Sequence, residues 1–291
     1  MTEQPAYSPV NELVLAQGSL TGVTFEQRVA AAAAGGFTAI GLSLYEYDRL
    51  LAAGTTDEEM LCILAVYNVK VAELDGLHGF AAADNQPGVR VGSSKAQDDH
   101  TLERLLDLAD LFHARHLQVF GTPNTDKLED DAVEKFQDIC DQAAQRRLEV
   151  SLEPRTNTNI TSIRTAAMIV SRAQRRNAGL CITTGQHFRA KNAAGDLLAI
   201  PADLVSAIRL SHEVTAPGAL DFTSSAIEDG RGTVEEDPEL IRFLQTITQH
   251  GVGVTLSVDA TSYRPNQTDP FAFCALLEDK TASIWNQAIR N

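Results

Sequence analysis

Polar or ionisable residues stand at the ends of seven short apolar segments, where packing alone does not explain them. The segments include VKVAEL, LEVSLEP, IRLSHE and VTLSVDA. Charged side chains seldom belong to a protein core, whereas carboxylates and imidazoles transfer protons and bind metal ions. Taken singly, each of these residues is equally well a solvated loop residue or an ion-pair partner. The candidates are Gln17, Glu73, Gln118, Glu153, Thr184, His212 with Glu213, and Asp259.

The elements that position these residues alternate regularly along the chain. Apolar runs predict eight strands, at residues 12–17, 37–42, 69–74, 116–121, 148–154, 178–183, 208–213 and 252–260. Helices are predicted after them, at residues 24–36, 57–68, 99–114, 131–147, 162–176, 201–207, 237–251 and 269–289. The first helix has Thr24 as a candidate N-cap and Gly35 as a candidate C-cap. The segment after the sixth strand, with His187, is expected to be a loop.

Regular alternation of strand and helix requires a parallel sheet. Eight such units in 291 residues predict a (β/α)8 TIM barrel, with an active site at the carboxyl ends of the strands. A doubly wound open sheet is the alternative, but no G-x-G-x-x-G motif follows the first strand. No linker or repeat divides the chain, so a single domain over residues 1–291 is expected. A barrel would bring Glu153, His212 and Asp259 close together.

Composition limits the partners of the chain. The formal net charge is −15, which opposes binding to nucleic acid and to anionic membranes. Four cysteines, far apart in sequence, suggest buried reduced thiols rather than a zinc site or a disulfide framework. The polar N-terminus lacks the pattern of a signal peptide, and no apolar run is long enough for a membrane span. A cytoplasmic protein with a small-molecule substrate is expected.

Five segments together resemble a known family. SLEP, LCITTGQHFRA, IRLSHE, DGRG and VTLSVDA occur in the order and spacing of the xylose-isomerase-like barrel family. That family includes sugar isomerases, sugar epimerases and inosose dehydratases, and apurinic-site endonucleases share its superfamily. The similarity extends over essentially the whole chain. Each motif is weak alone, but the ordered set is moderately specific.

The resemblance implies a divalent metal, Mn²⁺, Mg²⁺ or Zn²⁺, held by a glutamate, an aspartate, a histidine and a second glutamate. The first, third and fourth ligands correspond to Glu153, His212 and Asp259. The second falls on Thr183 or Thr184, which supply no carboxylate and would otherwise simply cap a turn. Two carboxylates and an imidazole can still hold such an ion, with His187 or Gln186 as a replacement ligand.

The resemblance also implies residues that contact substrate. His187 matches a substrate-contacting histidine of the family, and Arg231 in DGRG matches an arginine with that role. Glu73 and Gln118, at their strand ends, are further candidates for substrate binding. His113 and His116, which flank the end of the third predicted helix, are expected at the surface.

The sequence favours an isomerase or epimerase of a small sugar or polyol-derived carbonyl compound. A metal would polarise the carbonyl, and Glu153 and Asp259 would move the proton of the adjacent carbon. A lyase of the inosose- or dehydroshikimate-dehydratase kind shares the early chemistry. A non-catalytic sugar-binding barrel with a degenerate metal site is a third possibility. The acidic charge opposes an endonuclease. The apolar positions of residues 271–289 fit either a homo-oligomer interface or a cover for the barrel.

Overall fold

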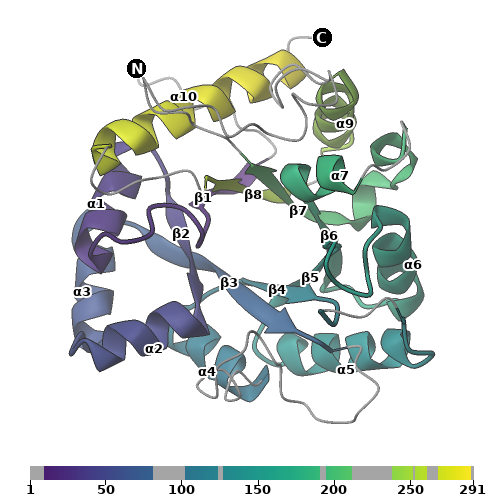
Figure 1. Ribbon diagram of the computed structural model, residues 1–291, viewed down its shortest axis with the longest axis horizontal. Helices are drawn as coiled ribbons and strands as arrows, with labels where there is room; N and C mark the ends of the chain where they lie inside the picture. The colour runs from purple at the N-terminus through teal and green to yellow at the C-terminus, as the bar shows by residue number, and fades with distance from the viewer. Residues whose placement is uncertain are drawn as a thin grey trace.

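Eight parallel strands close into a barrel in chain order, with β8 paired to both β7 and β1. The structure is a computed structural model that describes residues 10–80, 102–123, 127–190, 195–211, 238–251, 253–260 and 268–289. Seen down its axis, the strands form an inner ring and the helices an outer one (Figure 1). The predicted (β/α)8 TIM barrel is therefore confirmed.

All eight predicted strands are present, and the bounds of β3 and β7 differ most from the prediction. The third continues past Glu73 to His78, and the seventh begins at Val205. The strands are β1 (Val10–Leu15), β2 (Ala39–Ser43), β3 (Lys70–His78), β4 (His116–Phe120), β5 (Glu149–Glu153), β6 (Ala178–Thr183), β7 (Val205–Ser211) and β8 (Val254–Asp259).

The helices surround the barrel, and two of them were not predicted. The described helices are α1 (Phe25–Ala34), α2 (Leu44–Ala52), α3 (Asp57–Tyr67), α4 (Leu102–Phe112), α5 (Ala132–Ala144), α6 (Ile163–Ala173), α7 (Thr184–Arg189), α9 (Pro238–Gln249) and α10 (Pro270–Ile289). The expected loop with His187 is instead α7, and α2 precedes α3 between the second and third strands.

One predicted helix was wrong. Residues 201–207 form only a short 3-10 turn, η3 (Ala202–Leu204), before β7 begins. Val205 already pairs with Leu180 of β6, so the sheet takes the residues that the sequence assigned to a helix. Another 3-10 turn, η2 (Leu197–Ala199), precedes it.

The local sequence explains where the first helix begins. Thr24 accepts a hydrogen bond from the backbone N–H of Gln27, and the Gln27 side chain accepts one from the Thr24 N–H. This reciprocal pair is a capping box, which satisfies backbone donors that a helix start otherwise leaves unpaired. The predicted caps Thr24 and Gly35 are both confirmed.

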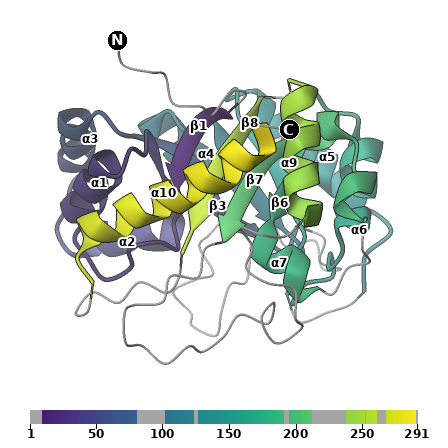
Figure 2. The same ribbon diagram turned by 90° about the horizontal axis from the view of Figure 1, so that it is seen from above.

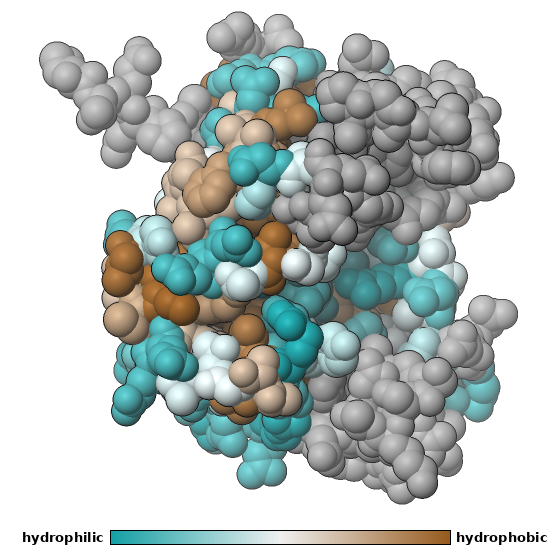
Figure 3. All heavy atoms as spheres, turned by 60° about the vertical axis from the view of Figure 1, so that its left-hand side comes forward, coloured by the Kyte–Doolittle hydropathy of each residue, from teal (hydrophilic) through white to brown (hydrophobic). Residues whose placement is uncertain are grey.

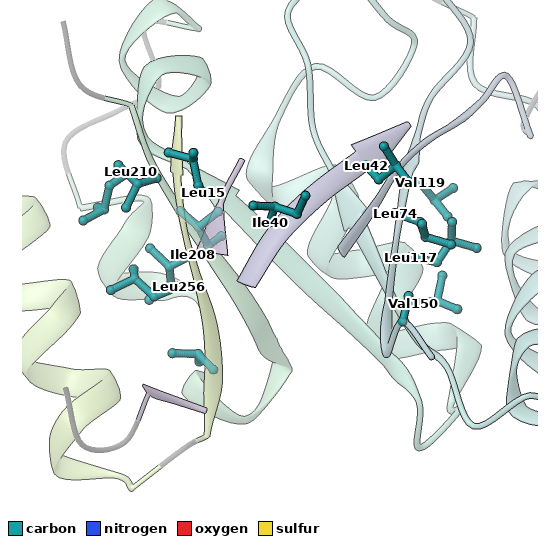
Figure 4. Close-up of a cluster of buried hydrophobic side chains, with 14 of the residues drawn as sticks. Leu15, Ile40, Leu42, Leu74, Leu117, Val119, Val150, Ile208, Leu210 and Leu256 are labelled. Atoms are coloured by element: carbon teal, nitrogen blue, oxygen red, sulfur yellow. The ribbon is translucent and has the colours of Figure 1, made fainter. Parts of the chain in front are cut away.

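The main hydrophobic core lies between the barrel and the helices. Alternate residues of each strand contribute to it, including Leu42, Leu74, Leu117, Ile208 and Leu256, labelled in Figure 4. Each is fully buried. Because successive side chains of a strand point to opposite faces, the residues between them point into the barrel. Those inward residues are largely polar, which is unusual for barrel interiors filled by branched aliphatic side chains.

The last helix closes the outer ring where the first and last strands meet. In the view of Figure 2, α10 crosses beside β1 and β8, and it packs against α1 and α9. A Cβ added at Gly35 would lie 2.6 Å from the Cβ of Cys274, so this approach of α1 and α10 requires glycine. None of the described helices has the length and apolar character to cross a membrane.

The surface on the side of α1, α2 and α3 mixes apolar and polar residues (Figure 3). Tyr45, Leu51, Leu61 and Val66 are the large exposed apolar residues of α2 and α3. The expectation of a homo-oligomer stays a prediction. Three cysteines are buried as expected, but Cys62 is exposed, and all four are free thiols.

Candidate active site

A buried arginine lies at the centre of a group of carboxylates inside the barrel. Arg209 of β7 is 3% exposed, and its Nη2 donates to Glu73 Oε1 and Gln118 Oε1, both at 2.5 Å. Its Nη1 donates to Asp75 Oδ2 at 3.2 Å and lies 3.5 Å from Glu153 Oε2. Strands β3 and β7 are not neighbours in the barrel, so these contacts cross its interior.

Glu73 and Gln118 are the residues that accept hydrogen bonds from Nη2 of this arginine. Both side chains have no exposed surface. The other oxygen of Glu73, Oε2, accepts from Ser257 Oγ at 2.5 Å and from Gln118 Nε2 at 3.1 Å. The oxygens of both residues are therefore occupied by protein donors. The two predicted substrate contacts lie in the interior network, where they hold Arg209 in position.

Glu153 ends β5 where the sequence predicted it, and it has two cationic neighbours. It is 1% exposed, and its Oε1 accepts from Arg155 Nε at 2.9 Å. Arg155 is nearer the surface and lies with its guanidinium carbon 3.5 Å from the centre of the Phe120 ring. A cation over an aromatic face is attracted to it. Glu153 thus lies between Arg155 and Arg209.

Asp259 ends β8, and one of its carboxylate oxygens has no hydrogen-bond partner among the described residues. In the described structure its Oδ1 is buried and has no hydrogen-bond partner. Burial raises the pKa of Asp259, and although Arg209 acts against that rise, the charges of Asp75 and Glu153 add to it. These influences require the groups to be close. A buried carboxyl with a raised pKa takes up and releases a proton more readily near neutral pH.

The pKa values of the other charged groups in this cluster are set by burial and by the two arginines. Burial raises the pKa of Glu73 despite the opposing charge of Arg209. Burial alone would also raise the pKa of Asp75, but the charges of Arg209 and Arg155 lower it below the ordinary value. Burial lowers the pKa of Arg209, yet Glu73, Glu153 and Asp75 overcome it and hold that pKa well above its usual value. Arg209 is therefore a permanent cation.

Thr184, one of the two threonines at the expected position of the second ligand, has structural contacts. Thr184 is 1% exposed, and its Oγ1 accepts from the backbone N–H of Ser211 at 2.9 Å. Ser211 Oγ in turn accepts from the N–H of Gly185 at 3.3 Å. These bonds connect the start of α7 to the end of β7. The interpretation of the two threonines as a turn cap stays a prediction.

His187, the predicted substrate contact, lies on α7 and is 7% exposed. It lines a small cavity together with Pro154, Ile163 of α6 and Ile182. Thr183 of β6 and Gln186 of α7 line it too, so this cavity lies where β6 meets α7. Two further predicted residues, His212 and Arg231, lie outside the described residues.

Sequence reasoning missed the central arginine. Arg209 is the one charged residue within the strand AIRLS, and an arginine in an otherwise apolar parallel strand was the available signal. Asp75 was missed because β3 is longer than predicted. The prediction of a surface position for His116 was wrong, since it is 2% exposed at the start of β4, with Nε2 2.5 Å from Ser151 Oγ.

The described residues do not fit the divalent metal that the resemblance implies. Among them, no group of three His, Cys, Asp or Glu side chains is arranged to hold an ion. Glu153, the first expected ligand, accepts from Arg155 and adjoins Arg209. An ion there would displace Arg155 and be repelled by Arg209, on the order of 4 kcal/mol for each unit of charge at 4 Å and an effective dielectric of 20. The second expected ligand is a threonine hydroxyl.

Comparison with solved structures places the fold among xylose isomerase-like TIM barrels. A xylose isomerase-like TIM barrel/4-hydroxyphenylpyruvate dioxygenase fusion protein matches with a TM-score of 0.67 and 17% identity, over 91% of this chain but only 41% of that one. The IOLI protein, in a structure with a zinc atom bound, matches with a TM-score of 0.70 and 12% identity, over 96% of this chain and all of that one.

The matching structures also include an epimerase, a probable dehydratase and an endonuclease. A D-allulose 3-epimerase from Methylomonas sp., in complex with D-allulose, matches with a TM-score of 0.64 and 16% identity, over 95% of this chain and 96% of that one. Others are a probable 3-DHS dehydratase and a family 2 AP endonuclease. No family model and no curated protein matches the sequence. At these identities the likeness establishes the fold.

Proposed function

We propose that this protein is an isomerase or epimerase that moves a proton at the carbon next to the carbonyl of a small sugar or polyol-derived compound. The observation that carries the proposal is the arrangement of Asp259, a buried carboxyl with one unpartnered oxygen, beside Glu153 and two guanidinium groups. An acid–base group next to fixed positive charge is what enolate chemistry requires.

Asp259 would act as the base. Its carboxylate takes the proton from the carbon next to the carbonyl, the C–H electron pair forms the C=C bond, and the carbonyl π pair moves to the oxygen. The negative charge that develops on this oxygen needs a cation nearby, and Arg155, the less buried of the two arginines, is the described group that could provide it. Return of a proton to either face, or to the neighbouring carbon, completes epimerisation or isomerisation.

Glu153 is proposed as the second proton-transfer group, as the sequence suggested. In this structure its ion pairs orient it. This step does not use Arg231, an expected substrate contact, or His212, an expected metal ligand. The substrate is expected to be small and polyhydroxylated, in keeping with the D-allulose that the Methylomonas epimerase binds.

Hydrogen exchange in deuterated water tests the proposal. The protein is incubated with a panel of small ketoses, aldoses and inososes, and NMR follows the C–H signals next to each carbonyl. Deuterium incorporation with a new isomer or epimer, lost in Asp259→Asn, is the expected result. Loss of water with formation of an enone would instead identify a lyase. Sugar binding without exchange for any compound would contradict an enzymatic role and favour a non-catalytic barrel.

A further inference from the structure

The interior of the barrel already contains the positive charge that a metal would bring. Four carboxylates that influence one another, Glu73, Asp75, Glu153 and Asp259, point into the barrel. Burying uncompensated carboxylates is costly, so such a group requires a cation close by. The described structure provides Arg209.

Arg209 contacts several carboxylates at once, as a bound metal ion would. One guanidinium reaches carboxylates of two strands, Glu73 and Asp75 on β3 and Glu153 on β5. It also donates a hydrogen bond to the amide oxygen of Gln118, which orients it. The guanidinium is planar, always charged and weakly hydrated, which suits it to buried pairing with several carboxylates.

A second guanidinium occupies the outer side of the same site. Arg155 follows Glu153 by two residues and pairs with it, and it stacks over Phe120. Of the side-chain nitrogens of Arg155, only Nε has a hydrogen-bond acceptor among the described residues. The expected metal ligand Glu153 therefore has an arginine on each side, and the expected aspartate is replaced by Thr184, whose hydroxyl accepts from the Ser211 N–H.

We propose that Arg209, with Arg155 beside it, is the resident cation of this carboxylate cluster, and that the site works without a bound divalent metal. The inference concerns the cation only and deepens the function proposed above. Arg209 acts as a positioning residue for Glu153 and Glu73, and Arg155 is the cation that faces the substrate. In this arrangement Glu73, Asp75 and Glu153 stay paired whether or not substrate is bound.

Metal analysis and thermal unfolding test the inference without any substrate. Protein purified without chelator should contain much less than one equivalent of Mn, Zn or Mg by elemental analysis. Its Tm should be the same with EDTA and with Mn²⁺ or Zn²⁺ added at micromolar concentrations, and calorimetric titration should show no binding. A retained equivalent of metal, or a micromolar Kd that is lost in Asp259→Asn, would overturn the inference.

Variants at two buried arginines sharpen the test. Arg209→Gln removes the guanidinium and leaves the carboxylates able to bind a cation, so Mn²⁺ should now raise its Tm by several degrees. Arg28→Met is the matched control: Arg28 is 4% exposed, but its Nη2 donates only to the backbone oxygens of Ala16 and Gly41. That variant should lose stability without gaining any response to metal.

A second substitution covers the case in which Arg209→Gln does not fold. Arg209→Lys keeps the charge, so it should fold and respond to Mn²⁺ no more than the parent protein does. If Arg209→Gln folds and Mn²⁺ does not raise its Tm, the guanidinium does not take the place of a metal ion, and the inference is contradicted. The outcome is independent of the proposed reaction, because a protein with no metal and no exchange activity would refute that reaction and leave this inference standing.

Discussion

At the scale of single residues, the site depends on how burial and charge divide the carboxylates into different roles. Glu73 and Asp75 pair with Arg209 inside the barrel, whereas Asp259 keeps one oxygen without a described partner. The strand-end pattern predicted Glu153 and Asp259, because a carboxylate after an apolar run is conspicuous. It could not reveal that Arg209 lies between them, since the contact joins strands that are far apart in sequence.

Replacement of Asp259 by Asn should separate activity from stability. The amide keeps the shape of the side chain but cannot accept the proton, so kcat should fall by about 10²- to 10⁴-fold, the range for a lost acid–base group. The Tm should stay the same or rise, because a buried carboxyl with a raised pKa gains little from its charged form. A clear decrease in Tm with activity retained would assign Asp259 a structural role instead.

His116 should make the protein less stable as the pH falls. Burial, with a smaller effect of Arg209, lowers its pKa to about 3 from an ordinary 6.5. Between these values the unfolded chain binds the proton and the folded protein does not, so stability is full above pH 6.5 and declines below it. The expected loss is about 2 kcal/mol at pH 5.

Denaturant unfolding at several pH values measures this effect. His116→Gln cannot titrate, so the difference in unfolding free energy between the parent and this variant should change by that amount between pH 7 and pH 5. The carboxylates titrate in both proteins and cancel in the comparison. Parallel profiles for the two proteins would show that the folded state binds a proton at His116 as easily as the unfolded chain does.

At the scale of elements, the sequence predicted the strands and helices that show a clear period. It failed where contacts with neighbouring elements decide the structure. All eight strands and the caps of α1 followed from local patterns. Helix α2 was missed because it is a second short helix in one connection, and α7 because its six residues show no clear period. The predicted helix before β7 was wrong because pairing with β6 outweighed local helix propensity.

The capping box of α1 gives a prediction at this scale. Thr24→Ala removes the acceptor of the Gln27 N–H and should lower the free energy of unfolding by about 1 kcal/mol. Thr24→Ser keeps the hydroxyl and should stay close to the parent protein. Chemical denaturation of the three proteins checks this. Equal stability of the alanine and serine variants would mean that water replaces the cap without cost.

At the scale of the whole molecule, the net charge of −15 sets how salt acts on the fold. Excess negative charge repels itself in the compact state, and salt screens that repulsion over a Debye length of about 10 Å at 0.1 M. Raising NaCl at neutral pH should therefore raise the Tm. MgCl₂ at equal ionic strength should raise it by the same amount, because no resident metal site is proposed. A much larger shift with MgCl₂ in differential scanning calorimetry would indicate specific binding of the ion.

The closed barrel makes the interior network possible. Contacts between β3 and β7 or β8 cross the lumen only because eight strands close into a ring. The charged interior is the feature that separates this chain from a barrel with an aliphatic centre. The fold could be predicted from the alternation of strands and helices. The charged network inside the barrel could not, because it depends on contacts between strands far apart in sequence.

The most direct test of this account is a crystal structure of the protein grown with millimolar MnCl₂, with anomalous diffraction measured for manganese. We expect the guanidinium of Arg209 among Glu73, Asp75 and Glu153, and no anomalous peak within the barrel. A manganese peak at about 2.0–2.6 Å from the oxygens of Glu153 and Asp259, with Arg155 turned away, would contradict it.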